Sequence, residues 1–206
     1  MSPSEFIYED DFLLVAVKPA GLLAVPGRGA DKQDCLSARI QAQFPDALVV
    51  HRLDMATSGL MMFARGTEMQ SVLSSMFRDR KVEKRYVAVV AGRLVAAAGE
   101  IALPLMPDWP NRPRQMVDHD SGKHSLTHYR VLTYDASTDV SRVELEPVTG
   151  RTHQLRVHMA ALGHPIMGDS LYGGPPAERL LLHASELRLA HLRPGKTLSF
   201  TSDAPF

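Results

Sequence analysis

Strand-like segments outnumber helical ones along this chain. Residues with β-branched, aromatic or alternating apolar character cover 12–17, 86–91, 125–134, 140–146, 180–189 and 197–201. The first of these, FLLVAV, is a continuous apolar run that stops at Lys18-Pro19, which is typical of a buried strand entering a turn. Because strands and helices do not alternate regularly, the pattern predicts an α+β fold with a mixed, mostly antiparallel sheet.

Three helical patterns interrupt the strands. Asp34 precedes apolar residues at four-residue spacing, so we expect it to cap a helix that stops near Phe44, just before a proline. A second helix is expected from Thr67, because Gln70 three residues later matches a capping box. A third is expected over residues 152–163, where a glycine provides the stop.

Composition indicates a globular chain. The 206 residues are 45% hydrophobic and 22% charged, and no long linker divides them, so we predict a single domain over residues 1–206. Cys35 is the sole cysteine, which excludes an intrachain disulfide and favours a reducing cytoplasm. No apolar run approaches the roughly 18 residues that a membrane span needs, so no membrane association is expected.

Net charge argues mildly against a nucleic-acid partner. The chain has 23 basic and 23 acidic residues, whereas many nucleic-acid-binding proteins are basic overall. The segment 78–85, RDRKVEKR, nevertheless concentrates five basic residues. It is either a binding patch or a solvated helix end, and the sequence leaves both open.

Polar residues gather in the segment HRLDMATSGL, residues 51–60, between apolar stretches. Such a junction of buried elements is a plausible wall of a site, with Asp54 as its carboxylate. The alternative is structural: Asp54 could cap the following turn through the Thr57 or Ser58 amide, with Arg52 as its surface partner.

A second polar cluster, TGRTHQLRVH, covers residues 149–158 at a helix start. His153 and His158 are five residues apart, a rotation of about 140° on a helix, so they do not converge on a metal and we expect none. Arg151 at a helix start suits a carboxylate or a phosphate. A solvated amphipathic helix end remains the alternative.

Two aromatic segments also carry cations. Tyr86 begins a strand in the segment KRYVA, where its ring could stack on a nucleobase or pack in the ordinary way. The proline-broken segment DWPNRPR places Trp109 beside Arg112 and Arg114. An aromatic ring with arginines on a loop suits single-stranded RNA, but Trp109 could equally pin the loop to the core.

Together these segments resemble the RluA-type pseudouridine synthases. The family motif HRLD-x-x-TSG is matched at every specified position, a coincidence on the order of one in 10^9 per starting position at random. Further segments resemble the family's other motifs: KPAGL, KRYVA, GRTHQLRVHMAALGHPIMGDSLYG and LLLHA. The resemblance implies the pseudouridine synthase fold. Because only a short stretch precedes the first strand, we expect no N-terminal S4 domain of the kind that many relatives carry.

The resemblance also implies an activity and its residues. Asp54 is the catalytic carboxylate, Arg151 is its cationic partner, and we expect an ion pair between them. Tyr86 stacks on the target base, and Arg52 fills the gap left by the flipped uridine. One of two leucines at 181 and 182 closes the pocket, but alternation does not say which.

The implied substrates are a uridine in large-subunit ribosomal RNA and another in a tRNA anticodon stem-loop. No cofactor is needed, and we expect a monomer. A glycosidase would need a second opposed carboxylate, and Asp169 in the MGDSLYG segment is more typical of a structural residue. An RNA-binding module with a dead site is the non-enzyme alternative, which the intact Asp54 disfavours.

Overall fold

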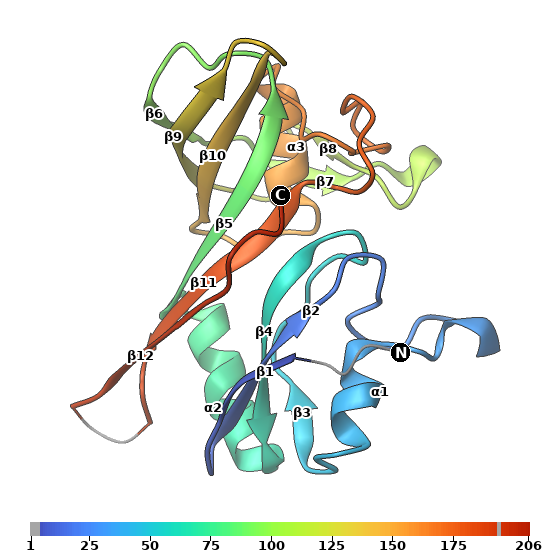
Figure 1. Cartoon of the computed structure of the whole chain (residues 1–206). Helices are drawn as coiled ribbons and strands as arrows, with labels where there is room; N and C mark the ends of the chain where they lie inside the picture. The colour runs from blue at the N-terminus through green and yellow to red at the C-terminus, as the bar shows by residue number, and fades with distance from the viewer. Residues whose placement is uncertain (1–4, 193–194) are drawn as a thin grey trace. The chain divides into compact units, whose positions relative to one another are not determined.

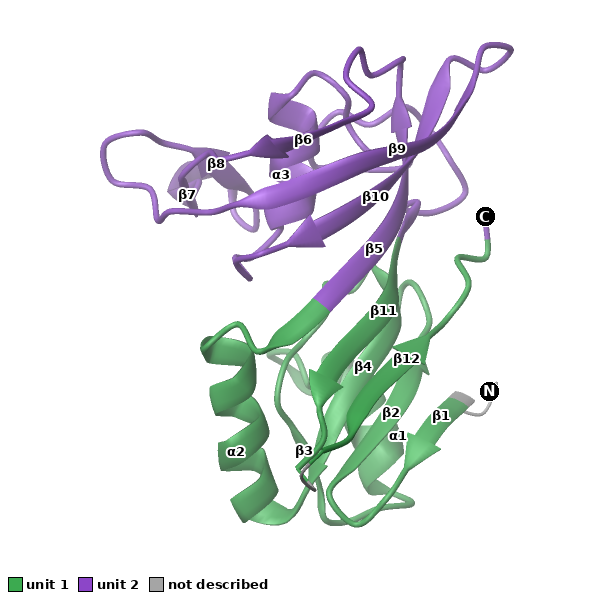
Figure 2. Ribbon diagram, turned by 90° about the vertical axis from the view of Figure 1, so that its left-hand side faces the viewer, with its two compact units in different colours: residues 1–83, 183–205 green, residues 84–182, 206 purple. Residues whose placement is uncertain are grey.

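A computed structural model of the chain describes residues 5–192 and 195–206. The chain forms two compact units, unit 1 with residues 1–83 and 183–205 and unit 2 with residues 84–182 and 206 (Figure 2). It passes from unit 1 into unit 2 within β5 (Val82–Ala91) and leaves unit 2 within β11 (Leu182–Ala190). The single domain expected over residues 1–206 stays a prediction.

Unit 1 is built on a mixed sheet (Figure 1). Its strands are β1 (Glu5–Glu9), β2 (Leu13–Lys18), β4 (Ser58–Arg65) and β11 in that order, with β3 (Ala47–Val49) on β4 and β12 (Thr197–Thr201) on β11. The pair β4–β11 is parallel and the other pairs are antiparallel. The helices are η1 (Ala30–Lys32), α1 (Leu36–Gln41) and α2 (Gly66–Arg78).

Both faces of the central strands of unit 1 are buried. On one face, side chains of β2, β4, β11 and β12 pack with Leu73 of α2. On the other, Leu14 and Phe63 pack with Leu36 and Ile40 of α1. A strand covered on both faces reads as a continuous apolar run instead of an alternating one. This is why the segment FLLVAV correctly predicts a buried strand.

Two predicted helix caps are wrong. The side chain of Cys35 caps α1, because its Sγ accepts the Ala38 amide at 3.4 Å. Asp34 instead forms a bidentate pair with Arg39 at 2.7 and 2.8 Å. At α2 no side chain caps the first turn, and the Gln70 amide donates to a carbonyl oxygen of β3 at 3.0 Å. In both cases the polar side chain bonds to another group instead of to the amides of the first helical turn.

Unit 2 has an antiparallel sheet in the order β5, β10 (Val140–Pro147), β9 (Thr127–Asp135) and β6 (Ala98–Ile101). Helix α3 (Gln154–Ala161) lies against β9 and β10 (Figure 1). A separate hairpin of β7 (Leu105–Pro107) and β8 (Gln115–Val117) carries η2 (Trp109–Asn111) in its loop. Alternate residues of β10 are buried, as expected for a sheet covered on one face. The α+β class and the mixed sheet are therefore confirmed.

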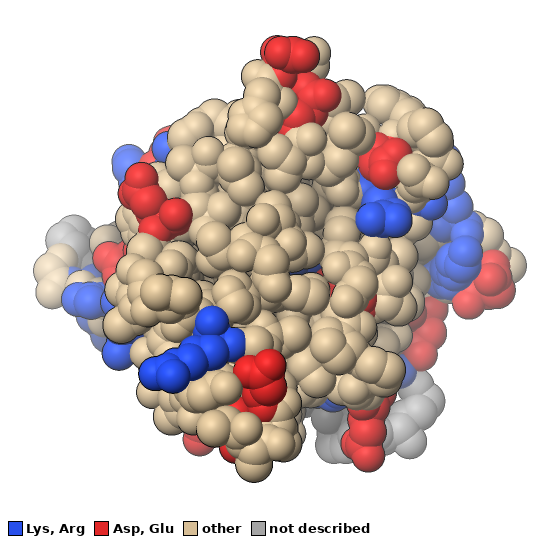
Figure 3. Space-filling view, turned by 90° about the horizontal axis from the view of Figure 1, so that it is seen from above, with Lys and Arg blue, Asp and Glu red and all other residues tan. Residues whose placement is uncertain are grey.

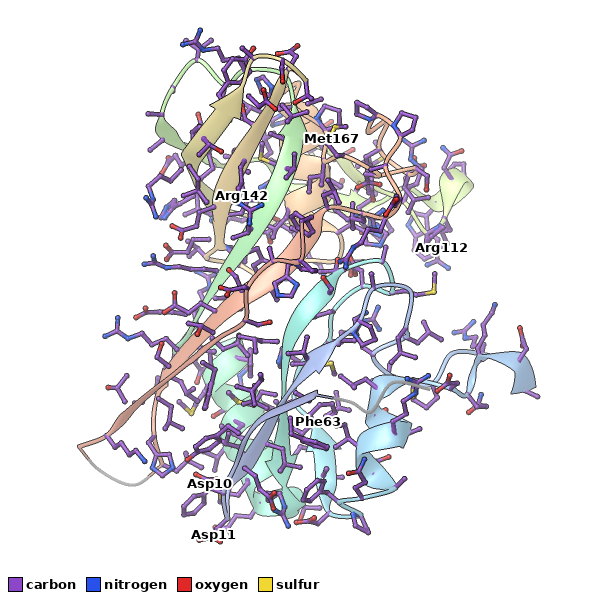
Figure 4. All side chains as sticks on the ribbon, in the orientation of Figure 1. Asp10, Asp11, Phe63, Arg112, Arg142 and Met167 are labelled. Atoms are coloured by element: carbon purple, nitrogen blue, oxygen red, sulfur yellow. The ribbon has the colours of Figure 1, made fainter. Side chains whose placement is uncertain are left out.

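The turn between β1 and β2 is held by Asp10 (Figure 4). Its carboxylate accepts the Phe12 and Leu13 amides at 2.8 and 2.9 Å, and it also bonds Tyr8 and His191 at 2.8 and 2.9 Å. Partial burial raises the pKa of Asp10, but these hydrogen bonds outweigh it and lower the pKa from 3.8 to about 2.

Because the folded pKa of Asp10 lies below its unfolded value, its stabilising effect is complete above pH about 4 and is lost as the pH falls toward 2. We expect Asp10→Asn to lower the free energy of unfolding by about 1 kcal/mol at pH 7, allowing for solvent screening, and by much less near pH 2. Urea unfolding at several pH values measures this. An equal loss of stability at pH 7 and pH 2.5 would contradict the assignment.

Candidate active site

Asp54 lies in a turn between β3 and β4 of unit 1. The Thr57 amide donates to the main-chain oxygen of Asp54 at 3.1 Å, so closing the turn in this way does not use the carboxylate. Asp54 is half-buried, Leu53 before it is buried, and Arg52 is exposed. The buried side chain of Leu53 therefore anchors the turn, and the polar side chains of Arg52 and Asp54 flank it in the sequence.

A buried lysine holds the middle of this turn. Lys18 ends β2 and is fully buried, and its Nζ donates to the carbonyl oxygens of Pro19, Leu22 and Met55 at 2.8, 2.7 and 3.0 Å. The Gly21 amide donates to the same Met55 oxygen at 2.9 Å. A buried ammonium is costly unless its protons are accepted. The segment KPAGL thus fixes the residue that directly follows Asp54.

The far end of the turn is tied to β11. Ser58 Oγ bonds His183 Nδ1 at 2.8 Å, and His183 Nε2 bonds Ser202 Oγ at 3.1 Å. Strands β4 and β11 pair in parallel with His183 opposite Ser58 and Ala184 opposite Gly59. Gly59 has φ +117°, and a Cβ there would lie 2.3 Å from the Ala184 carbonyl oxygen. The close approach of β11 therefore requires the glycine of the motif, while the serine supplies the hydrogen bond to His183.

In unit 2, the turn that carries Arg151 is organised by a buried glutamine. Gln154 Oε1 accepts the Arg151 amide at 3.0 Å and the Thr149 hydroxyl at 2.7 Å. Its Nε2 donates to the Leu126 carbonyl and Thr127 Oγ1 at 2.9 and 3.0 Å. Arg151 itself is exposed. The sequence motifs assigned no role to Gln154. Its position as the first residue of the helix that follows TGRTH could have indicated one.

A second arginine of the same segment is engaged inside the fold. Arg156 is buried and forms a bidentate ion pair with Asp169, with both contacts at 2.7 Å. Asp169 also accepts the Leu171 amide at 3.1 Å, which agrees with its expected structural role. A buried carboxylate matched in this way is not available as the second acid of a glycosidase.

The two histidines of this segment take part in separate hydrogen-bond sets. His153 Nδ1 bonds the Tyr172 hydroxyl at 2.7 Å, while His158 bonds Thr127 and the Leu103 carbonyl at 2.9 and 3.0 Å. Burial lowers the pKa of His158. Within residues 5–192 and 195–206, no group of three His, Cys, Asp or Glu side chains is arranged to hold a metal ion.

Strand β5 carries Tyr86, which is half-buried and pairs in register with Leu145 of β10. Leu182 is 3% exposed, whereas Leu181 is half-buried. The Leu181 main chain bonds the Met167 oxygen at 2.9 Å and the Val89 amide at 3.1 Å. Which of the two leucines lines a pocket stays open.

The loop of the β7–β8 hairpin presents an aromatic ring and a cation to solvent. Trp109 is 61% exposed, and the Arg112 guanidinium lies 3.6 Å from the centre of its ring (Figure 4). The interpretation in which Trp109 pins the loop to the core is therefore wrong. The Arg114 guanidinium lies over a different ring, 5.7 Å from the centre of the Tyr172 ring.

On the face drawn in Figure 3, most of the surface is uncharged, and Lys and Arg side chains lie in small groups, some of them beside acidic side chains. Arg78 and Arg80 at the end of α2 are exposed, as a solvated helix end requires. No helix in the described parts of the chain combines the length and the apolar character needed to cross a membrane.

The predicted site residues are distributed over the two units. Arg52 and Asp54 belong to unit 1, whereas Tyr86, Arg151, the two leucines and the Trp109 loop belong to unit 2. The expected ion pair between Asp54 and Arg151 stays a prediction.

Comparisons with known proteins identify the family of this chain. The sequence profile described as RNA pseudouridylate synthase matches residues 12–161. Two curated relatives named "Dual-specificity RNA pseudouridine synthase RluA" are similar over most of the chain. The one from Escherichia coli K12 is 48% identical over 97% of this chain and 93% of its own length. The one from Vibrio cholerae is 50% identical over 92% and 78%.

Solved structures show the same fold. Human RNA Pseudouridylate Synthase Domain Containing 1 superimposes with a TM-score of 0.82 at 30% identity, covering 98% of this chain and 84% of that one. Human RNA Pseudouridylate Synthase Domain Containing 4 gives 0.80 at 25% identity, with 98% and 88% covered. The chain therefore belongs to the RNA pseudouridylate synthase family, and it is an isomerase that converts uridine in RNA to pseudouridine.

Proposed function

We propose that Asp54 is the catalytic residue of this isomerase, and that its substrates are a uridine in large-subunit ribosomal RNA and another in a tRNA anticodon stem-loop. The observation that carries the assignment of Asp54 is the anchoring of its turn by Lys18 on one side and by Ser58 and His183 on the other. A carboxylate on a fixed turn is pre-organised for chemistry. The dual-specificity names of the relatives support the two substrates.

The reaction needs a carboxylate and no cofactor. The bond between C1′ of the ribose and N1 of uracil breaks, the base turns, and a bond from C1′ to C5 forms. The proton on C5 is then removed, and N1 takes up a proton. An ionised carboxylate can stabilise the positive charge that develops on the sugar, attack the sugar, or accept a proton from it.

The remaining residues receive roles by their match to the family motifs. We assign Arg151 as the cation that keeps Asp54 ionised, and Tyr86 as the ring that stacks on the base and assists removal of the C5 proton. Arg52, which is exposed, is assigned to the gap that the flipped uridine leaves. Leu181 or Leu182 provides the apolar wall.

The setting of the enzyme follows from the same resemblance. We propose that it acts as a monomer in the cytoplasm, where RNA substrates are available. The buried free thiol of Cys35 is compatible with a reducing compartment.

Replacing Asp54 tests the catalytic assignment. We expect Asp54→Asn to lower tritium release from RNA labelled at uracil C5 to below about one-thousandth of the wild-type rate, because the amide cannot supply the negative charge. Asp34→Asn is the matched control, since it removes an exposed carboxylate of the same unit, and it should retain wild-type release. Label release by Asp54→Asn at the wild-type rate would refute the mechanism, as would free uracil or strand cleavage by the wild-type enzyme.

The Trp109 loop is proposed to contact RNA through its exposed ring and the Arg112 guanidinium. Removing either side chain should raise KM for stem-loop RNA about tenfold while kcat is retained, because stacking on an exposed ring contributes to binding. Steady-state kinetics measures the two constants. Arg93→Ala is the control, since Arg93 also lies over an aromatic ring of unit 2, that of Tyr134. A KM that rises equally in Arg93→Ala would contradict a specific contact.

The substrates can be identified in cells. Mapping pseudouridines in ribosomal RNA and tRNA with and without the gene should show one loss in large-subunit ribosomal RNA and one in a tRNA anticodon stem-loop. Loss in only one of the two RNA classes would rule out the proposed dual specificity.

A further inference from the structure

His51, the first residue of the HRLD motif, makes an unusual hydrogen bond. Its Nε2 accepts the main-chain amide of Met62 in β4 at 2.9 Å. Its ring stacks on Phe77 of α2, with 4.3 Å between ring centres and 22° between planes. Neither the motif nor its spacing assigned a role to this side chain.

The partner of His51 determines its protonation state. A main-chain N–H can only donate, so Nε2 must present a lone pair. An imidazolium carries a proton on both nitrogens and cannot accept this bond. His51 is therefore a neutral imidazole with its proton on Nδ1.

This hydrogen bond lies in a part of β4 between the residues that pair with β3 and those that pair with β11. Strand β3 pairs with residues 63–65 of β4, and β11 pairs with Ser58 and Gly59. The stretch Leu60–Met62 lies between these two neighbours, and the Met62 amide finds its acceptor in His51. The imidazole thus takes over the task of a strand partner in this interval, and it ties the start of the Asp54 turn to β4.

The turn is then held at three points. Lys18 and Gly21 bind the carbonyl of Met55 directly after Asp54, and His183 binds Ser58 at the far end. His51 lies three residues before Asp54, and it is the anchor at the near end. Losing it would remove the hydrogen bond that ties the main chain leading into Asp54 to β4.

We propose that His51 is a positioning residue for Asp54, acting through the hydrogen bond from the Met62 amide to its neutral Nε2. The proposal rests on the proposed function, in which Asp54 is the catalytic carboxylate. His51 acts on the main chain and not on the RNA, so its loss should slow the chemical step and leave RNA binding intact.

Two substitutions separate the acceptor from the ring. His51→Phe retains a ring for the stack on Phe77 but has no acceptor, whereas His51→Gln loses the ring but can place a carbonyl oxygen near the Met62 amide. We expect His51→Phe to lower kcat about 10- to 100-fold, with KM for stem-loop RNA changed less than about twofold, because small misplacements of a reacting group have effects of this size. His51→Gln should recover most of the lost kcat.

His191→Phe is the matched control. His191 is another histidine of unit 1 that packs against a phenylalanine, Phe12; it is buried, and its Nε2 bonds Asp10. Its replacement should lower Tm while kcat stays at the wild-type value. A loss of kcat in His191→Phe equal to that in His51→Phe would overturn the positioning role, because a packed histidine elsewhere in the unit would then have the same effect.

The protonation state is measured on the wild-type protein, which makes the test independent of how the variants fold. Ring ¹⁵N NMR should show His51 with its proton on Nδ1, and a proton on Nε2 would overturn the proposal. Wild-type kcat in His51→Phe, or equal losses in His51→Phe and His51→Gln, would also overturn it. If Asp54→Asn is inactive in these cases, only the role of His51 fails; if Asp54→Asn is active, the proposed function itself fails.

Discussion

The buried ammonium of Lys18 is the interaction on which the candidate site depends. A cation without water needs its protons accepted, and three main-chain oxygens from two separate segments converge on it. These oxygens can accept the protons of Lys18 together only if both segments keep the conformation seen here. The cost of burying the charge therefore becomes a constraint on the turn that contains Asp54. A neutral side chain at this position would remove the cost and the constraint together.

The same segment shows how much of the site could be predicted from the sequence. The motif located Asp54, and the apolar run located β2, because a strand buried on both faces is apolar throughout. Position along the chain could not reveal that Gly59 lies against Ala184 or that Ser58 bonds His183, since these contacts join residues more than 120 positions apart. Hydrophobic periodicity predicts single helices and strands, but it does not predict how strands that are distant in the sequence pair with one another.

Charged residues were the least predictable group. Arg151 lies three residues before α3 and is exposed, whereas Arg156 lies in the first turn of α3 and is buried against Asp169. The difference comes from the turn that carries Asp169, which is 13 residues away and has no helical pattern. The predicted helix caps are wrong for a related reason: Asp34 and Gln70 have suitable side chains, but Asp34 pairs with Arg39 of α1 and Gln70 donates to β3.

Unit 1 combines segments from the two ends of the sequence, so the order of synthesis affects when it can fold. Its core includes Leu187, Leu189, Leu198 and Phe200, which come from the last part of the sequence. Unit 2 is contained in residues 84–182, apart from Phe206. On a ribosome the middle of the chain therefore emerges with nearly all of its partners present, while the core of unit 1 must wait for β11 and β12. The hydrogen bond between Ser58 and His183 can therefore form only after residues 84–182 of unit 2 have been synthesised.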